Sequence, residues 1–306
     1  MRRGPTHGFL KICMLACPLL LFATAIQAQD ARVYLNTPRG TSIFQFNVID
    51  SNSSTDDEDG LENQVTDSKT YLTNYIYAME GLFGRTASLG ITAPIVDYFS
   101  YDSATDSILN NMSGLGDIGI TIDHNFYGGM SMDKKVFAET PPCNYGGIHM
   151  VLSTPTGAYD PSNTTNIGSN RFSLKVLLQQ SFILNKATAW LDLYASSTFF
   201  WDNDEYQGSN TLSQNAQFKL YSYYSQNIGS PRTWAELGMV YTNGGAIYVD
   251  GIEQASNQST FQAALGLSAT IWKRGTLRTL YMPTLYENRD NFHKGYSLQL
   301  RYQQLF

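Results

Sequence analysis

Apolar and polar residues alternate with a period of two along most of this chain, and this pattern limits the possible folds more than any other feature. Between Phe261 and Ile271 every second residue is apolar, and the residues between them are polar or small. Similar stripes recur over 117–126, 189–195 and 235–242. Successive side chains of a β-strand point to opposite faces, so the pattern predicts strands with one apolar and one polar face.

Twelve strands are predicted along the chain. Many are longer than the ~5–6 residues of an average globular strand, and their length suits a tilted strand that crosses a bilayer. The predicted strands cover about 41–51, 68–81, 85–100, 114–127, 143–155, 171–184, 187–202, 214–228, 232–243, 260–273, 276–286 and 295–306.

The predicted connections alternate between long and short. The long ones lie near 52–67, 101–113, 156–170, 203–213, 244–259 and 287–294, and the short ones near 82–84, 185–186, 229–231 and 274–275. Outer-membrane barrels have short periplasmic turns and longer extracellular loops. Segment 128–142 is the exception, since its position calls for a short turn. We therefore predict an all-β protein, a transmembrane antiparallel β-barrel of about 12 strands; a large soluble β-sandwich is the alternative.

The residues before the first strand have the organisation of a secretory signal peptide. Basic residues precede an apolar run over 12–25, and small residues follow up to Ala28. This order of basic, apolar and small segments is typical of a cleaved export signal. We predict a signal peptide over residues 1–28 and a barrel over residues 29–306; an uncleaved anchor helix and lipidation at Cys17 are the alternatives.

Removal of this segment changes the charge and cysteine content. Loss of Arg2, Arg3 and Lys11 takes the formal net charge from −6 to −9. Nucleic acid binding needs a basic surface, so no nucleic acid partner is predicted. Cys143 would be the one cysteine left, which excludes an intramolecular disulfide and zinc sites built from paired cysteines. No motif implies a cofactor or a metal.

The charged residues of the predicted strands fall opposite the apolar stripes. An Arg or Lys at the lipid midplane costs about 2–4 kcal/mol, so the charged face is predicted to line the lumen. Tyrosines on that face add aromatic surface with hydroxyl donors. The predicted lumen-lining residues are Asp117, Asp123, Lys175, Asp192, Tyr194, Lys219, Glu236, Arg278 and Arg301.

Several short motifs carry a family resemblance through their order and spacing. They are ARVY at 31–34, PRGT at 38–41, LFGRTA at 82–87, GLGD at 114–117, TPTGAYDP at 154–161 and NIGSNR at 166–171. Together they resemble a family of outer-membrane transporters named for the meta-cleavage pathway of phenol degradation. The resemblance implies an outer-membrane β-barrel and passage of aromatic or other small organic compounds. The last strand also ends in Phe306, and a terminal aromatic residue there resembles the signal read by the barrel-assembly machinery.

These features predict a channel or transporter for passive uptake of small organic solutes in the outer membrane of a Gram-negative bacterium. Its expected partners are outer-membrane lipid and lipopolysaccharide, the barrel-assembly machinery through Phe306, and a small-molecule solute. A surface-interaction or structural barrel without transport is the first alternative. The acidic segment 52–67 motivates it, although its spacing lacks the glycine and final carboxylate of an EF-hand.

A barrel hydrolase is the second alternative. Such an enzyme needs a serine and a histidine, or an acidic pair with a histidine, in a defined arrangement. Beyond the signal peptide the histidines are His124, His149 and His293, and none lies in a recognisable nucleophile motif. The sequence therefore predicts that the protein is not an enzyme.

Overall fold

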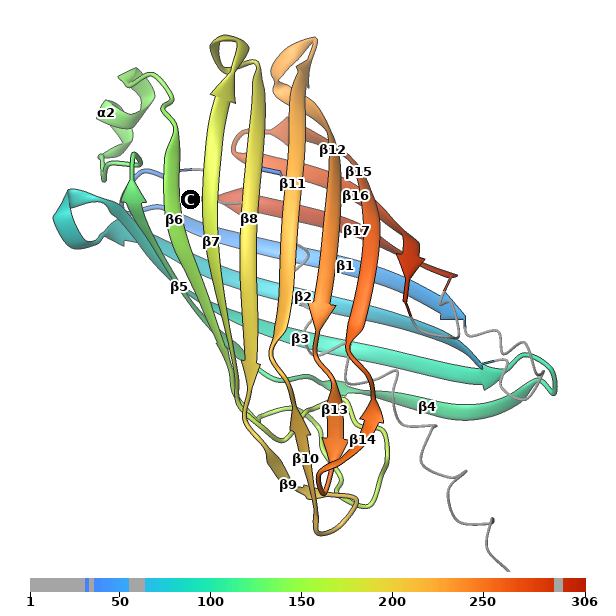
Figure 1. Cartoon of the computed structure of the whole chain (residues 1–306). Helices are drawn as coiled ribbons and strands as arrows, with labels where there is room; N and C mark the ends of the chain where they lie inside the picture. Colours follow the sequence, from blue (N-terminus) through green and yellow to red (C-terminus); the bar gives the residue numbers. More distant parts are fainter. Residues whose placement is uncertain (1–30, 33–35, 55–63, 289–293) are drawn as a thin grey trace, which may run out of the picture.

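The structure is a computed structural model that describes residues 31–32, 36–54, 64–288 and 294–306 (Figure 1). The predicted signal peptide lies outside these ranges. No helix of the described residues has the length and apolar character needed to cross a membrane.

Twelve strand positions form a closed antiparallel barrel (Figure 1). One sheet contains thirteen strands. β4 and β5 pair with successive parts of the same edge of β3 and so count as one position in the wall. The pairing of β2 with β3 closes the barrel. The strands are β1 (Ser42–Ser54), β2 (Gln64–Glu80), β3 (Thr86–Asp102), β4 (Ser107–Leu115), β5 (Gly119–Tyr127), β6 (Tyr145–Ser153), β7 (Ser173–Leu184), β8 (Ala189–Phe200), β11 (Gln217–Ile228), β12 (Ser230–Gly244), β15 (Gln258–Trp272), β16 (Gly275–Glu287) and β17 (Lys294–Leu305). This architecture confirms the predicted barrel.

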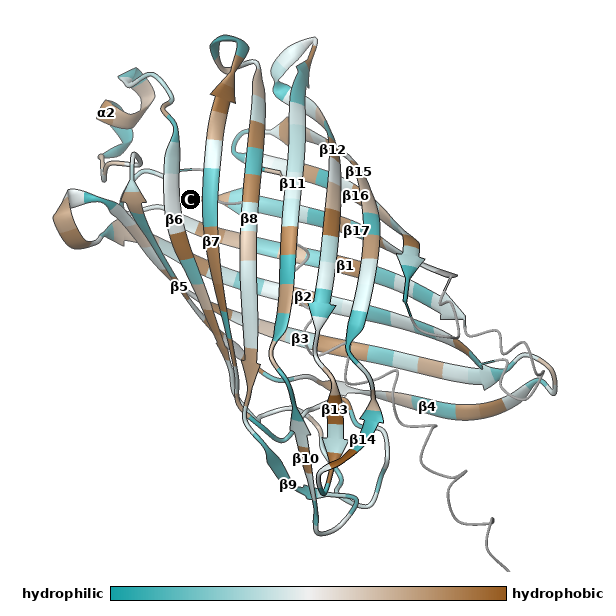
Figure 2. Ribbon diagram, in the orientation of Figure 1, coloured by the Kyte–Doolittle hydropathy of each residue, from teal (hydrophilic) through white to brown (hydrophobic). Residues whose placement is uncertain are grey.

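The barrel wall is apolar outside and polar inside. Figure 2 shows hydrophobic and hydrophilic positions alternating along the strands. On β15, Leu265 and Leu267 are about half exposed, at 50% and 51%, although they lie in the middle of a long strand. Asn47 and Gln217, which face the interior, are almost completely buried. Polar burial with apolar exposure is the reverse of a water-soluble protein, and it is the pattern of a barrel that contacts lipid.

The two ends of the barrel differ in the length of their connections, as predicted for all but the segment 101–113. At one end, here called the short-turn end, the connections are tight, as at η3 (Leu82–Gly84) and η4 (Asn185–Ala187). The segment 128–142 is also at this end and contains the helix α2 (Lys134–Glu139), whose N-terminal amides of Lys135 and Val136 donate to Asp133. The opposite end, the long-loop end, carries the extended connections (Figure 1).

A small second sheet lies at the long-loop end. Its strands are β9 (Asn203–Tyr206), β10 (Asn210–Gln214), β13 (Ile247–Val249) and β14 (Ile252–Ala255). Tyr206, Leu212 and Ile247 form its buried core. The predicted long loops 203–213 and 244–259 are thus partly strand, in pieces too short for the period of two to be recognised.

The prediction for residues 101–127 was wrong in two respects. Most of the predicted loop 101–113 is strand: the turn between β3 and β4 covers only 103–106, and 107–113 belong to β4. The predicted strand 114–127 is broken between Leu115 and Gly119. The cause is that β4 pairs with β3 alone and is exposed over most of its length. With no buried face, its sequence has no reason to alternate.

Candidate functional site: the barrel lumen

Eight of the nine predicted lumen-lining residues share the interior face of their strands. Their side chains are buried or half-buried, as expected for residues that point away from the apolar exterior. These eight are Asp123, Lys175, Asp192, Tyr194, Lys219, Glu236, Arg278 and Arg301.

The ninth predicted residue, Asp117, holds a loop. It lies in the break between β4 and β5, where its carboxylate accepts hydrogen bonds of 2.9 Å from the backbone amides of Gly157 and Ser169. The hydroxyl of Ser169 donates to the same carboxylate at 2.5 Å. Asp117 therefore fastens the segment between β6 and β7 to the wall.

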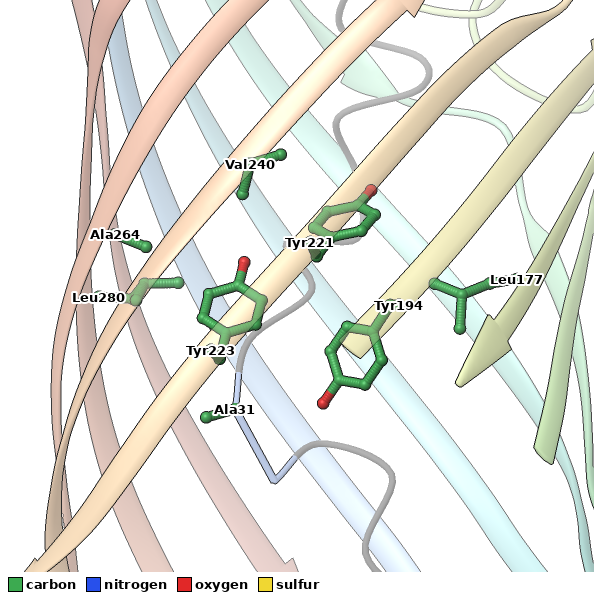
Figure 3. Close-up of a cluster of buried hydrophobic side chains, with 8 residues drawn as sticks. All are labelled: Ala31, Leu177, Tyr194, Tyr221, Tyr223, Val240, Ala264 and Leu280. Atoms are coloured by element: carbon green, nitrogen blue, oxygen red, sulfur yellow. The ribbon is translucent and has the colours of Figure 1, made fainter. Parts of the chain in front are cut away.

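Ala31 and Arg32, the described residues of the N-terminal segment, lie in the lumen. Figure 3 shows Ala31 inside the barrel beside Tyr223 and Tyr194. The Ala31 amide donates to Glu236 Oε2 and the Arg32 amide to Asp192 Oδ2, each at 2.9 Å. The predicted interior carboxylates of Glu236 and Asp192 thus bind backbone amides of residues 31 and 32, and these two residues occupy space in the lumen.

The Arg32 guanidinium forms a second set of contacts. Its Nε donates to Ser225 at 2.8 Å and its Nη1 to Asn227 at 2.8 Å. The guanidinium carbon lies 5.7 Å from the ring centroid of Trp190 and 5.1 Å from that of Trp234, within cation–π range. Burial lowers the pKa of Arg32 to about 10, and the nearby Asp192 opposes that shift. The group therefore stays cationic at neutral pH.

Glu236 and Arg278 form a buried ion pair across an intervening strand. Arg278 Nε donates to Glu236 Oε1 at 2.9 Å, and Arg278 Nη2 contacts Oε2 of the same carboxylate. Glu236 is on β12 and Arg278 on β16, with β15 between them. Gly266 of β15 lies directly opposite Glu236, and a Cβ there would be 2.2 Å from Glu236 Oε1. The missing side chain at Gly266 is what lets the pair form.

A cavity of about 320 Å³ lies in the lumen toward the short-turn end. Its walls combine charged groups with amides and hydroxyls, and Arg32 and Phe137 of α2 are also among its lining residues. The predicted residues Asp123, Arg278 and Arg301 line it. Such a mixed lining can hydrogen bond a polar solute or water.

Asp123 and His149 make contact at this cavity. His149 Nδ1 contacts Asp123 Oδ1, and the hydroxyl of Ser88 donates to Asp123 Oδ2 at 2.6 Å. In a serine hydrolase the serine hydroxyl bonds the imidazole. Here the Ser88 hydroxyl bonds the carboxylate, so the observed contacts are not those of a nucleophile activated by histidine.

The remaining histidines and acidic residues do not add a site. His124 Nε2 contacts the carbonyl oxygen of Leu82 at 3.3 Å, and His293 lies outside the described residues. Of the acidic segment 52–67, Asp67 accepts from Asn52 at 2.6 Å, and the other acidic residues lie outside the described ranges. Within those ranges, no group of three His, Cys, Asp or Glu side chains could hold a metal ion.

Three tyrosines line the lumen on the long-loop side of Arg32. Tyr194 lies 6.2 Å from Tyr221 and 6.0 Å from Tyr223 between ring centroids, and all three are buried (Figure 3). Gly238 faces Tyr223 across the strands, and a Cβ there would be 2.1 Å from the ring. The rings therefore form one aromatic surface on the inner wall.

Sequence reasoning missed Arg32 and its two tryptophans as lumen residues. Arg32 is not on a strand, so the period of two gives no information about it. Its one signal was its place in the motif at 31–34. Trp190 and Trp234 lie at the short-turn ends of their strands, where an aromatic residue is also expected as a membrane-interface anchor.

Comparison with known proteins identifies the fold. No protein-family model and no curated protein matches the sequence. The chain is similar to the crystal structure of an outer-membrane channel from Pseudomonas putida F1, with a TM-score of 0.75, 20% identity, and coverage of 91% of this chain and 100% of that chain. It is also similar to the beta domain of the Bordetella autotransporter BrkA, with a TM-score of 0.56, 10% identity, and coverage of 87% and 100%.

At these identities the likeness shows the fold alone. The chain has the barrel architecture of outer-membrane proteins. Because a channel and an autotransporter domain share this barrel, the function has to be argued from the interior.

Proposed function

We propose that this protein is a channel or transporter in the outer membrane of a Gram-negative bacterium, for passive uptake of small organic solutes, including aromatic ones. The observation that carries the proposal is the lumen cavity with its charged and hydrogen-bonding walls. Burying an ion costs several kcal/mol. A barrel with a purely structural role could fill its interior with apolar side chains and avoid this cost. Charged side chains that line an open cavity can bind a polar solute as it passes through the lumen.

The tyrosine surface supports the choice of solute. Aromatic rings prefer offset or edge-to-face contacts with other rings, and the hydroxyls of Tyr194, Tyr221 and Tyr223 supply hydrogen-bond partners. The resemblance of the sequence motifs to transporters of phenol degradation supports this class of solute. The likeness of the fold to an outer-membrane channel from Pseudomonas putida supports a channel without indicating its solute.

The proposed location implies specific partners. Exposed apolar residues on the outer wall would contact outer-membrane lipid, and the long-loop end would lie among lipopolysaccharide. Phe306, which is exposed at the end of the chain, would be read by the barrel-assembly machinery.

Liposome swelling with a panel of solutes tests the channel. We expect liposomes that contain the folded protein to swell with phenol-sized solutes faster than empty liposomes. The charge reversal Arg278→Glu places two carboxylates together in the lumen and should change the relative rates of anionic and cationic solutes. Absence of permeability to every solute, with an intact folded barrel, would reject the proposal.

A further inference from the structure

Two lysines face the lumen on the long-loop side of the tyrosine surface. Lys175 is near the start of β7 and Lys219 near the start of β11, with β8 between them. Each lysine is on the same face of its strand as a buried interior residue two positions further on, Leu177 for Lys175 and Tyr221 for Lys219. Both residues keep an intermediate solvent exposure.

No carboxylate of the described residues neutralises these two lysines. Within those residues, neither ammonium takes part in an ion pair, whereas Glu236 is engaged by Arg278 and Asp192 by the Arg32 amide. The nearest neighbours across the strands carry no charge. The residues directly opposite the lysines are Val151, Thr198, Ser196 and Thr242.

The lysines adjoin the aromatic surface. Lys175 Nζ lies 5.9 Å from the centroid of the Tyr221 ring. The rings of Tyr221 and Tyr194 are 6.2 Å apart between centroids (Figure 3). The Tyr221 hydroxyl shares a hydrogen bond with Ser196, which is directly opposite Lys219. Cationic groups, hydroxyls and ring faces thus meet on one stretch of the inner wall.

Two uncompensated cations in a partly desolvated site are unfavourable, and an anion between them removes both the repulsion and part of the desolvation cost. We propose that Lys175 and Lys219 form a binding site for an organic anion, whose carboxylate lies between the two ammonium groups and whose apolar part lies against Tyr221 and Tyr194. This inference rests on the proposed function in one respect, since the lumen must admit the solute.

Calorimetric titration of the purified full-length barrel in detergent tests the site with benzoate as the probe. Benzamide, which has the same shape and no charge, is titrated in parallel at the same ionic strength. We expect benzoate to bind more tightly than benzamide. In the double variant Lys175→Gln and Lys219→Gln, benzoate affinity should fall by about tenfold or more and benzamide affinity should not change.

Matched variants separate charge from folding. Lys186→Gln makes the same substitution in the short turn between β7 and β8, and it should leave benzoate affinity unchanged. The double variant Lys175→Arg and Lys219→Arg keeps both charges and should retain binding. If the double glutamine variant does not fold, Lys175→Gln alone should still weaken benzoate binding.

The proposal is overturned if the wild-type barrel binds benzoate no more tightly than benzamide, or if the glutamine variants bind benzoate as the wild type does. Failure of the channel has a different signature. Liposomes that do not swell, together with intact benzoate binding that depends on the lysines, would reject transport and support the anion site.

Discussion

At the scale of single residues, the lumen is organised by charged groups that bind backbone or one another. Asp192 and Glu236 accept the amides of Arg32 and Ala31, while Arg278 completes the coordination of Glu236. Interactions of this kind are strong in a low-dielectric interior, where each unpaired group would carry a large desolvation penalty. The arrangement fixes Ala31 and Arg32 of the N-terminal segment at a defined height in the barrel.

Arg32→Ala is expected to release residues 31–32 from the lumen wall. The substitution removes two hydrogen bonds from a charged group and the contacts with Trp190 and Trp234. The binding free energy of residues 31–32 to the wall should fall by ~3 kcal/mol, which raises the fraction of molecules in which they are detached by roughly a hundredfold. Single-channel conductance in planar bilayers should therefore rise. Arg39→Ala is the control, because Arg39 and Glu80 form an exposed pair at 2.8 Å; an unchanged conductance in Arg32→Ala would contradict the prediction.

Gly266→Ala is expected to weaken the barrel through Glu236. The added Cβ would be 2.2 Å from Glu236 Oε1, so the carboxylate must leave its position against Arg278. Breaking a buried ion pair costs about 3–5 kcal/mol, which a urea unfolding curve in detergent would resolve. Gly119→Ala, whose Cβ has no neighbour nearer than 3.3 Å, should change stability far less. Equal effects of the two substitutions would be evidence against this role of Gly266.

The alternation predicted the facing of the lumen residues but not their pairing. Glu236 and Arg278 are two strand positions apart, and their contact depends on the absence of a side chain at Gly266. Periodicity reports only which face a residue occupies, so it contains no information about such diagonal contacts. The hydrogen bonds of Asp117 to the loop could not be predicted for a related reason: Asp117 lies in a break between strands, where the period no longer defines a face.

At the scale of elements, the break between β4 and β5 is joined to the loop that follows β6. Besides the bonds to Asp117, the Ala158 amide donates to the Leu115 carbonyl at 2.7 Å, and the Ile118 amide donates to the Thr156 hydroxyl at 2.9 Å. The loop therefore satisfies backbone groups that a continuous strand would have bonded to its neighbour. Two of the family-like motifs, at 114–117 and 154–161, meet at this point.

Asp117→Ala should loosen this loop. Three hydrogen bonds to one carboxylate are lost, and bonds to charged groups contribute about 1.5–3 kcal/mol each. We expect faster protease cleavage between residues 157 and 169 of the folded protein, measured by mass spectrometry of the fragments. Asp160→Ala removes a carboxylate of the same loop that, among the described residues, bonds Ser162 alone, so cleavage of this variant should stay near the wild-type rate. A similar rate for both variants would count against the fastening role.

Strand boundaries elsewhere were predicted within a few residues because each strand has one face toward lipid and one toward the lumen. β8, for example, was expected over 187–202 and runs from Ala189 to Phe200. The prediction failed where that environment is missing, as in β4 and in the small sheet. These elements are held by edge pairing and local turns, which leave little periodic signal.

At the scale of the whole molecule, the polarity of the wall determines where the barrel is stable. Leu265→Arg puts a charge at the middle of β15 on the outer face, and it should destabilise the barrel in lipid vesicles by about 2–4 kcal/mol. Ile252→Arg is a control, because Ile252 is exposed on β14 beyond the barrel wall. Urea unfolding in vesicles measures both. Equal stabilities of the two variants would contradict an outer wall solvated by lipid.

The pairing of β1 with β17 determines when the cylinder can be completed. Gln45 bonds Gln303 across this seam at 2.9 Å, although the two residues are 258 positions apart in the chain. An exported polypeptide emerging from its N-terminus would keep one edge of β1 without a neighbour until the final strand arrives. Such a long-range closure is slow, and an open strand edge invites aggregation in the meantime. Biogenesis of this protein should thus depend on a factor that shields the nascent edge until synthesis and export are finished.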